Sequence, residues 1–297
     1  MYINHNLMAN NVGNTLASHY SNLQTSTQRL SSGLRVNSAA DDAAGLAIRE
    51  LMRADIASLQ QGVRNANDAI SLIQTADGAL GIIDEKLIRM KELAEQAATG
   101  TYDSTQRLMI ESEYQAMASE ITRIANSTDF NNIKLLDGNL SSDKHDGSGP
   151  ASTGKLKVHF GAGNDSAEDY YYIRIGDSTA SALGVGSSAT RFTDEADART
   201  VSTQGAAQKA LVGINNAIVS KDKIRAHLGA LQNRLENTIS NLTTQAENLQ
   251  SAEARISDVD VATEMTQFVR NQILTQSAVA MLSQANSMQQ MAMQLIG

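Results

Sequence analysis

Residues 52–97 read MRADIASLQQGVRNANDAISLIQTADGALGIIDEKLIRMKELAEQA, and apolar side chains recur in this stretch at intervals of three and four residues. That spacing is the heptad period of a coiled coil, and it runs for about six heptads. Residues 203–256 repeat it, and the single proline, Pro150, lies between the two stretches. The sequence predicts a mainly α fold, a long antiparallel helical coiled-coil bundle with a small β-hairpin region in the middle of the chain. The first stripe comprises Met52, Ile56, Leu59, Val63, Ala66, Ile70, Ile73, Ala76, Leu80, Ile83, Leu87, Met90, Ala94 and Ala97.

Shorter patterns fill the rest of the chain. Helices are expected at residues 4–32, 104–127 and 259–296, and alternating apolar residues at 155–160 and 170–175 predict a hairpin. Residues 130–136 should be extended, residues 137–154 should form an exposed loop, and residues 176–201 give no clear pattern. The expected apolar stripe of the helix at 104–127 is Leu108, Met109, Tyr114, Met117, Ile121 and Ile124.

Both ends of the chain exclude charge. Residues 1–28 and 271–297 contain no Asp, Glu, Lys or Arg, although 19% of the whole chain is charged. Burial of an unpaired charge is costly, so we expect these ends to be enclosed, and termini of a monomer usually fray. The ends are therefore predicted to become buried when many copies assemble. The predicted assembly residues are Leu7, Leu16, Tyr20, Leu23, Leu30, Met265, Phe268, Ile273, Met281, Leu282, Met288, Met291 and Leu295.

The C-terminal methionines allow two interpretations. Met281, Met288, Met291 and Met293 could fill a core, or they could form an adaptable surface that packs against several neighbours or a carrier.

Composition and motifs argue against several functions. A net charge of −8 disfavours nucleic acid, and no apolar run of about 20 residues predicts a membrane span. Gly149 to Lys155 resembles the start of a phosphate-binding loop, but Leu156 stands where a Mg²⁺-binding hydroxyl is needed. Asp41 and Asp42 are expected to start a helix rather than act in catalysis. We expect no enzyme activity, no cofactor and no metal site, because the histidines are scattered at His5, His19, His145, His159 and His227.

Longer strings carry a family resemblance. Residues 1–6 (MYINHN), 28–37 (QRLSSGLRVN) and 41–48 (DDAAGLAI) resemble the amino-terminal signature of bacterial flagellin. Residues 246–256, 258–260, 272–274 and 280–286 are similar to its carboxy-terminal signature. The resemblance covers about residues 1–138 and 203–297. Because the middle of the chain, about residues 139–202, is short, the chain looks like a minimal flagellin.

The resemblance implies a domain plan. The inner tube domain would comprise residues 1–36 and 259–297. The rod domain would comprise residues 37–258, including the hairpin and loop region 130–202.

The resemblance also implies a function. The chain would be a secreted structural subunit that self-assembles into the extracellular flagellar filament for swimming. It would be exported by the flagellar type III apparatus, which agrees with the absence of a visible signal peptide. Its partners would be other copies of itself, an export chaperone, and the cap and hook-junction proteins. A hook-filament junction or other axial protein is the alternative; a helical sensor domain is less favoured.

A secondary role follows from the same resemblance. Flagellins recognised by the innate Toll-like receptor 5 use an arginine, a leucine and a glutamate of the rod domain. Residues 87–93 (LIRMKEL) look like that segment, so Arg89, Leu93 and Glu113 are the expected receptor contacts. Met117 departs from the pattern, because flagellins that bind well often carry a basic residue there.

Overall fold

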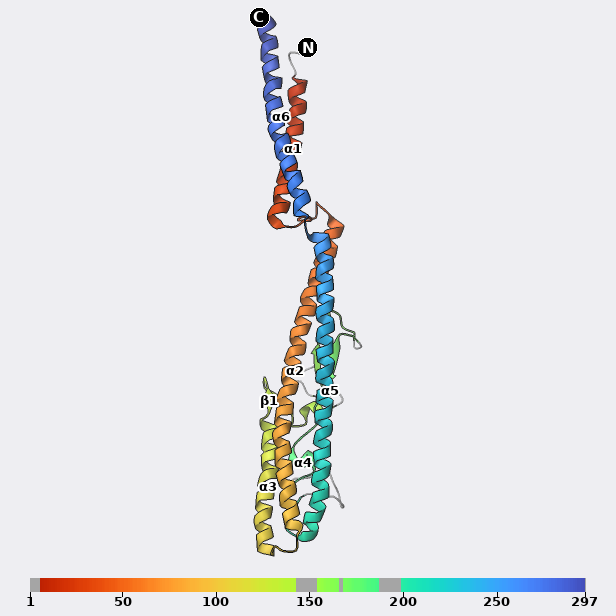
Figure 1. Ribbon diagram of the computed structural model, residues 1–297. Coiled ribbons are helices and arrows are strands. Elements are labelled where there is room, and N and C mark those ends of the chain that lie inside the picture. The colour runs from red at the N-terminus through yellow and green to blue at the C-terminus, as the bar shows by residue number, and fades with distance from the viewer. Residues whose placement is uncertain (1–5, 143–153, 166–167, 187–198, 297) are drawn as a thin grey trace. The chain divides into compact units, whose positions relative to one another are not determined.

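The computed structural model describes residues 6–142, 154–165, 168–186 and 199–296 (Figure 1). The side chains at positions 292, 293, 295 and 296 lie outside this description. Long helices dominate, which confirms the predicted fold class. The elements in chain order are α1 (Leu7–Ser32), α2 (Ala43–Ala98), α3 (Ser104–Ser127), β1 (Asp129–Phe130), β2 (Ile133–Lys134), η1 (Asn139–Ser141), β3 (Leu156–His159), β4 (Tyr170–Ile173), α4 (Ala180–Leu183), α5 (Gln204–Ser257) and α6 (Val261–Ile296).

The chain forms two compact units. The terminal unit comprises Met1–Ile56 and Ala246–Gly297, and the central unit comprises Ala57–Gln245, so α2 and α5 contribute to both. The predicted domain limits, 1–36, 37–258 and 259–297, differ from the boundaries of these two units, and they stay a prediction.

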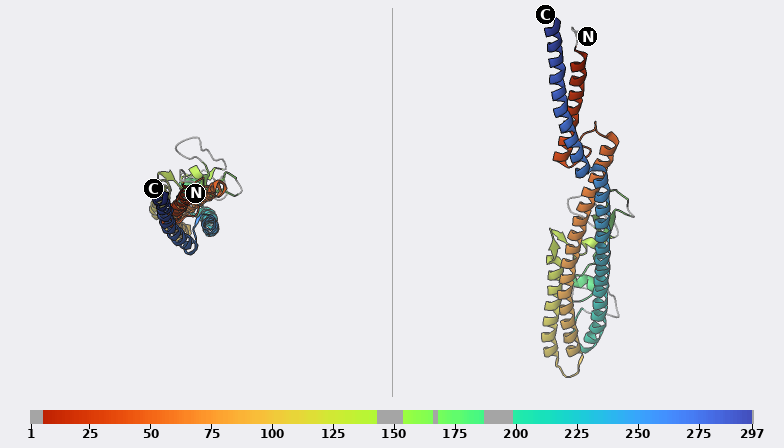
Figure 2. Two further views of the ribbon diagram at one scale, coloured as in Figure 1. Left: turned by 90° about the horizontal axis from the view of Figure 1, so that it is seen from above. Right: turned by 45° about the horizontal axis from the view of Figure 1, so that its top comes forward.

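The core of the central unit is built by α2, α3 and α5, which lie side by side (Figures 1 and 2). The heptad residues of α2 point into it: Leu80, Ile83, Leu87 and Met90 are all fully buried. On α5, Ile214 and Leu228 complete the packing. Because helices expose one stripe to their neighbours, the heptad period places these side chains in a single interior.

The predicted stripe of α3 was partly wrong. Leu108 and Met109 are 59% and 69% exposed, whereas Ile110 is buried and Tyr114 is fully enclosed. The helix buries Ile110, Tyr114, Ile121 and Ile124, which are spaced by three, four and seven residues. Leu108 lies off this face, so its hydrophobicity did not decide its orientation.

Two ion pairs join the antiparallel helices α2 and α5. Lys221 Nζ lies 2.5 Å from Asp84 Oδ1 and 2.8 Å from Asp222 Oδ1, and its side chain is 2% exposed. Arg225 Nε donates to Asp77 Oδ1 at 2.7 Å. Because each pair joins a different turn of the two helices, together they fix the register of α2 against α5.

A short hairpin replaces the predicted extended segment at 130–136. β1 and β2 pair through Asp129–Lys134 and Phe130–Ile133, and the chain reverses at Asn131 and Asn132. Both asparagines have positive φ, 49° and 65°, which is the pattern of a type I′ turn.

The predicted hairpin at 155–160 and 170–175 is confirmed as β3 and β4, which pair antiparallel from Leu156–Ile173 to His159–Tyr170. One of its faces packs on the core through Val158 and Ile173. Gly62 of α2 permits the approach of the strand end, because a Cβ there would collide with the Phe160 carbonyl. On the α5 side, the Arg234 guanidinium lies 3.6 Å from the centre of the Tyr171 ring.

The expectations for residues 137–154 and 176–201 can be compared with the structure only in part, because some of these residues lie outside the described ranges. Most of the predicted loop 137–154 lies outside them, and α4 occupies part of 176–201, for which no element is predicted. Within the described ranges, no helix combines the length and the hydropathy needed to span a bilayer.

Candidate assembly interface

The terminal unit is organised around α1 and α6, which lie antiparallel (Figures 1 and 2). The Asn6 side chain caps α1 by accepting from Ala9 N at 2.9 Å, and Gly33 ends the helix in a left-handed conformation. At the start of α6, Asp260 accepts hydrogen bonds from Thr263 Oγ1 and from two backbone amides. These bonds, that of the Thr263 side chain above all, lower the pKa of Asp260.

The seam between α1 and α6 is made of small and polar residues. Its buried members are Ser26, Glu264, Thr275, Ala278 and Ala285. At one end of the pair, Asn6 Nδ2 donates to the Ala285 carbonyl at 3.2 Å. At the other end, Arg29 Nη1 lies 3.9 Å from Glu264 Oε2, and Glu264 is 6% exposed. Polar contacts thus align the two helices at both ends, and the large apolar side chains along the pair are at most half-buried.

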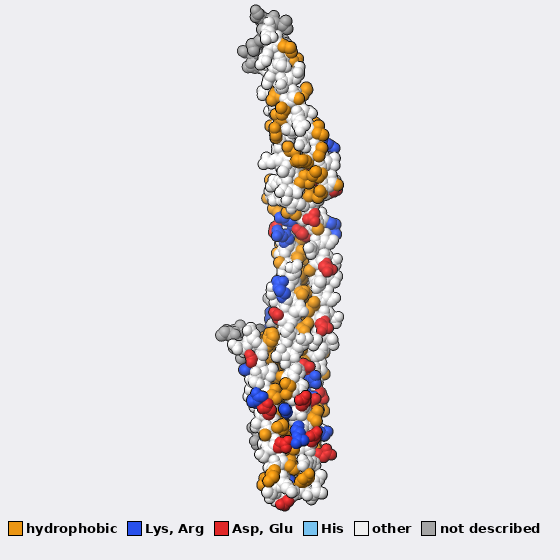
Figure 3. Space-filling model, turned by 60° about the vertical axis from the view of Figure 1, so that its left-hand side comes forward, with side chains coloured by type: hydrophobic (Ala, Val, Ile, Leu, Met, Phe, Trp, Pro, Cys, Tyr) orange, Lys and Arg blue, Asp and Glu red, His pale blue; other side chains and the backbone are white. Residues whose placement is uncertain are grey.

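Many large apolar side chains of this pair point outward. Figure 3 shows the surface over α1 and α6 with many hydrophobic and few charged side chains. On α6 they include Val261, Met265, Ile273, Val279 and Met281, which are exposed along the length of the helix. Because α1 covers only one side of α6, this exposed apolar surface marks a site for further contacts.

The predicted assembly residues fall into two groups. Seven are exposed, and five are half-buried along the α1–α6 pair; only the backbone of Leu295 is described. The exposed residues are Leu7, Tyr20, Met265, Ile273, Met281, Met288 and Met291. The half-buried residues are Leu16, Leu23, Leu30, Phe268 and Leu282.

Sequence reasoning missed a hydrogen-bonded junction within the terminal unit. Leu34 bridges Asp258, Val259 N donates to the Gly33 carbonyl at 3.0 Å, and Arg35 Nη2 donates to the Ile256 carbonyl at 2.8 Å. These contacts join residues that are more than 200 positions apart, so no local sequence pattern predicts them.

Asp41 and Asp42 have separate roles at this junction. Asp42 Oδ1 accepts from Gly45 N at 2.9 Å, which confirms a helix-start role at α2. Asp41 Oδ2 accepts from Ser38 N at 2.9 Å and from Asn37 N at 3.2 Å, so it caps the preceding turn instead. The hydrogen bonds from Ser38 lower the pKa of Asp41.

The residues predicted for receptor contact are only partly accessible. Arg89 of α2 donates to Glu113 of α3 through Nε at 3.0 Å and Nη2 at 2.8 Å, and through Nη1 to Glu92 at 2.9 Å. These bonds, the one to Glu113 first, raise the pKa of Arg89. Leu93 is 1% exposed. Because its side chain belongs to the core of the central unit, Leu93 offers no surface for direct contact, and that part of the prediction is corrected.

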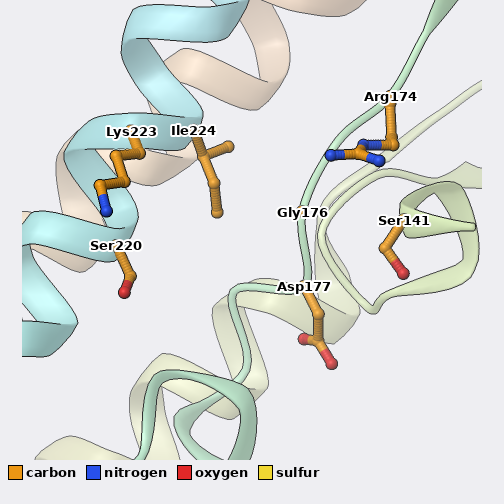
Figure 4. A pocket seen from close by; sticks show the side chains of 7 residues that line it. All are labelled: Ser141, Arg174, Gly176, Asp177, Ser220, Lys223 and Ile224. Carbon is orange, nitrogen blue, oxygen red and sulfur yellow. The ribbon is translucent and has the colours of Figure 1, made fainter.

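A polar cavity of about 450 Å³ opens beside α5 in the central unit. Figure 4 shows that its side chains come from three places: the segment 174–177, Ser141, and α5 through Ser220, Lys223 and Ile224. Gly176 allows this close approach, because a Cβ there would lie 2.8 Å from Ile224 Cδ1. The cavity gathers two cations and one carboxylate, without an arrangement of nucleophile and base.

The candidates for metal ligands stay apart. No group of three or more His, Cys, Asp or Glu within the described ranges could hold an ion, and His5 and His145 lie outside those ranges.

Comparison with known proteins identifies two matching family regions. The bacterial flagellin N-terminal helical region matches residues 3–141, and the bacterial flagellin C-terminal helical region matches residues 211–296. The first covers α1 to η1, and the second covers most of α5 with α6.

Individual relatives agree over the whole length. The flagellin of Bacillus subtilis (strain 168) is 45% identical, and the flagellar filament 33 kDa core protein of Treponema phagedenis is 40% identical; each match covers 100% of both chains. A solved structure described as that of a flagellar hook-associated protein from Vibrio parahaemolyticus shares the fold, with a TM-score of 0.55 at 13% identity over 73% of this chain and 100% of that chain. The chain therefore belongs to the bacterial flagellin family, the structural subunits of the flagellar motility filament.

Proposed function

We propose that the chain is secreted through the flagellar export apparatus and assembles with other copies of itself through the outward faces of α1 and α6. The exposed apolar side chains of α6, including Ile273 (56% exposed) and Met281 (55% exposed), carry the proposal. Apolar patches of this extent on a soluble chain mark interaction sites. Heterologous contacts between identical subunits generate open helical polymers, which suits a filament.

The same faces suggest how the subunit meets its other partners. Before assembly an export chaperone would cover the methionines of α6, because Met side chains adapt to different surfaces. The cap and the hook-junction proteins would contact the same helices at the two ends of the filament. We propose no catalytic activity and no cofactor for this chain.

A single substitution tests the assembly proposal. Ile273→Asp places a charge on the outward face of α6, where assembly would bury it at a cost of several kcal/mol. Because Ile273 is exposed in the single chain, the helix content of the monomer should not change. Filament growth from seeds, followed by sedimentation and electron microscopy, should be abolished.

The matched control is Ile273→Met, which keeps the side chain apolar and should assemble normally. Filaments of normal length from Ile273→Asp would contradict the proposal. The alternative, a hook-filament junction protein, predicts that even the wild-type chain stops at short rings or stubs. The relatives of this chain that are named as flagellins and filament core proteins favour the long polymer.

We further propose that Toll-like receptor 5 recognises the exposed Arg89–Glu113 pair. The two side chains come from neighbouring helices and are held together by two hydrogen bonds. Leu93 would act from beneath, by fixing the turn of α2 that carries Arg89.

Receptor signalling by purified monomer tests this second role. Arg89→Ala should reduce signalling at least tenfold, whereas Arg123→Ala removes a more exposed arginine of α3, paired with Glu120, and should not. Equal responses from the two variants would exclude the pair as a receptor contact.

A further inference from the structure

Methionine is the side chain of this protein that a mild oxidant attacks most readily. The chain has no Cys and no Trp, but it has eleven Met. Without thiols to consume the oxidant, the thioethers react, and those that solvent reaches react first. The exposed methionines are therefore the expected sites of oxidative modification.

The methionines differ widely in exposure. Met90 is fully buried in the core of the central unit, so an oxidant does not reach it in the folded chain. Met109 of α3, also in the central unit, is strongly exposed. Among the described side chains, five exposed methionines belong to the terminal unit. These terminal methionines are Met8 of α1 and Met265, Met281, Met288 and Met291 of α6.

Several terminal methionines lie at one end of the α1–α6 pair. There the side chain of Asn6, which caps α1, donates to the Ala285 carbonyl of α6. Met8, Met281 and Met288 each lie within about one helical turn of this contact along their own helix. Their thioethers therefore belong to the apolar surface that the proposed assembly would bury.

Oxidation changes what such a side chain can pack against. A hydroperoxide transfers one oxygen atom to the sulfur: a sulfur lone pair forms the S–O bond, the O–O bond breaks, and the leaving oxygen takes up the remaining proton. The sulfur loses two electrons and the peroxide gains them, so that hydrogen peroxide becomes water and the thioether becomes a polar sulfoxide. An apolar contact offers the sulfoxide oxygen no donor, so its burial is unfavourable.

We propose that the terminal methionines are sites of reversible oxidation, and that a hydroperoxide which oxidises them excludes the subunit from the filament. The inference rests on the proposed assembly through the outward faces of α1 and α6. In the unassembled chain these side chains are open to solvent, whereas in the filament neighbouring copies would shield them. Thiol-dependent methionine sulfoxide reductases restore the thioether, and with it the ability to assemble.

The test compares seeded filament growth before and after the monomer is treated with hydrogen peroxide. Peptide mass spectrometry should find an added oxygen at the terminal methionines and at Met109 but not at Met90, and the helix content should not change. The monomer concentration needed for growth should rise by about tenfold or more, because each buried sulfoxide oxygen lacks a partner. Treatment with the reductases for both sulfoxide epimers and dithiothreitol should reverse the rise. Unimpaired growth of the oxidised monomer would overturn the proposal.

Two leucine variants locate the effect. In the fivefold variant, all terminal methionines are replaced by Leu, which has a similar volume and keeps the surface apolar. This variant should grow equally well before and after peroxide. Met109→Leu removes a strongly exposed methionine of the central unit, and peroxide should still block its growth. Continued sensitivity of the fivefold variant, or resistance of Met109→Leu, would place the effect elsewhere and refute the proposal.

A protection measurement needs no substitution. In wild-type filaments the terminal methionines should be oxidised about tenfold or more slowly than in the monomer, because reactivity follows exposure. Free methionine added to both samples gives the reference rate for the oxidant. Equal rates in filament and monomer would contradict the proposal, also in the case that the fivefold variant fails to grow even without peroxide.

The outcomes for this proposal and for the proposed function are distinct. If the untreated wild-type chain forms no filaments, the assembly proposal fails, and the inference that depends on it fails too. If untreated and oxidised wild-type chains form filaments equally well, assembly stands and only the oxidation proposal fails.

Discussion

The two units of this chain use apolar residues in opposite ways. In the central unit, Ile83 and Leu87 are fully buried between helices of the same chain. In the terminal unit, Ile273 and Met281 are more than half exposed, while Ser26 and Thr275 occupy the seam. The central unit therefore closes a hydrophobic core by itself. The terminal unit leaves large apolar side chains exposed, and their burial requires contact with other molecules.

Removal of α6 should give the largest contrast between the units. Deletion of residues 260–297 takes away most of the exposed apolar surface of the terminal unit and should abolish filament formation completely. The thermal unfolding of the central unit should stay unchanged, because its core contains no residue of α6. Electron microscopy and calorimetry check the two halves of this prediction, and long filaments from the truncated chain would break the comparison.

A matched pair of alanine substitutions comes next. Ile83→Ala opens a cavity in the core of the central unit and should lower the free energy of unfolding by about 2–5 kcal/mol. Ile273→Ala, at an exposed position, should change that of the monomer by no more than about 0.5 kcal/mol. Urea denaturation of both monomers gives the values, and similar losses would mean that the terminal pair buries more than its exposures indicate.

Within the described residues, Lys221 is the one buried cation that links α2 to α5, and its substitution tests how much this link stabilises the central unit. Lys221→Met leaves Asp84 and Asp222 without their shared partner, and these carboxylates are 29% and 59% exposed. Because water still reaches both, the loss should be about 1–2 kcal/mol, less than for a fully buried pair. Adding Asp84→Leu should recover part of it in a double-mutant cycle; additive losses would show that the pair does not couple the helices.

Acid should loosen the junction of the terminal unit before it affects the central core. The hydrogen bonds from Ser38 depress the pKa of Asp41, so this carboxylate stabilises the fold fully above the ordinary value of 3.8. The contribution is lost as the pH falls below 3.8 and through the depressed pKa. The amide NMR signal of Ser38 should shift over that range in wild type and stay flat in Asp41→Asn. An unchanged titration in the variant would assign the effect to another group.

The smallest effect is expected at the β1–β2 turn. Asn132 has a φ of 65°, a conformation that glycine adopts without steric cost. Asn132→Gly should therefore stabilise the central unit by about 0.5 kcal/mol or leave it unchanged, whereas Asn132→Val should destabilise it. Thermal melts of the two variants measure the difference, and a stabilising valine would refute the turn assignment.

The long helices were predictable from their periodic patterns, whereas the face that each helix buries was less predictable. The heptads of α2 and α5 and the limits of α3 followed from the sequence, because many residues agree on one period. Leu108 and Met109 were misplaced because hydrophobicity does not reveal which face of α3 meets α2. The β1–β2 hairpin was missed because its strands have two residues each; the only local signal was the pair Asn131–Asn132.

The candidate surfaces show the same limit. The absence of charge pointed to the terminal helices, but which apolar residues face the seam depends on how α1 pairs with α6. Likewise the segment around Arg89 was found from its resemblance, whereas the burial of Leu93 follows from packing against distant parts of the central unit. The junction formed by Gly33, Leu34 and Asp258 needs backbone contacts over the length of the chain, which no short motif encodes.

The Arg29–Glu264 pair has a consequence for how this chain can change over time. Glu264 is the only acidic residue of α6, and a shift of α1 by one turn would move Arg29 away from it. An insertion or deletion between Asn6 and Arg29 must then be matched by an equal change between Glu264 and Ala285, or one of the two polar contacts at the ends of the pair is lost. The two helices, although far apart in sequence, are therefore expected to change in length together.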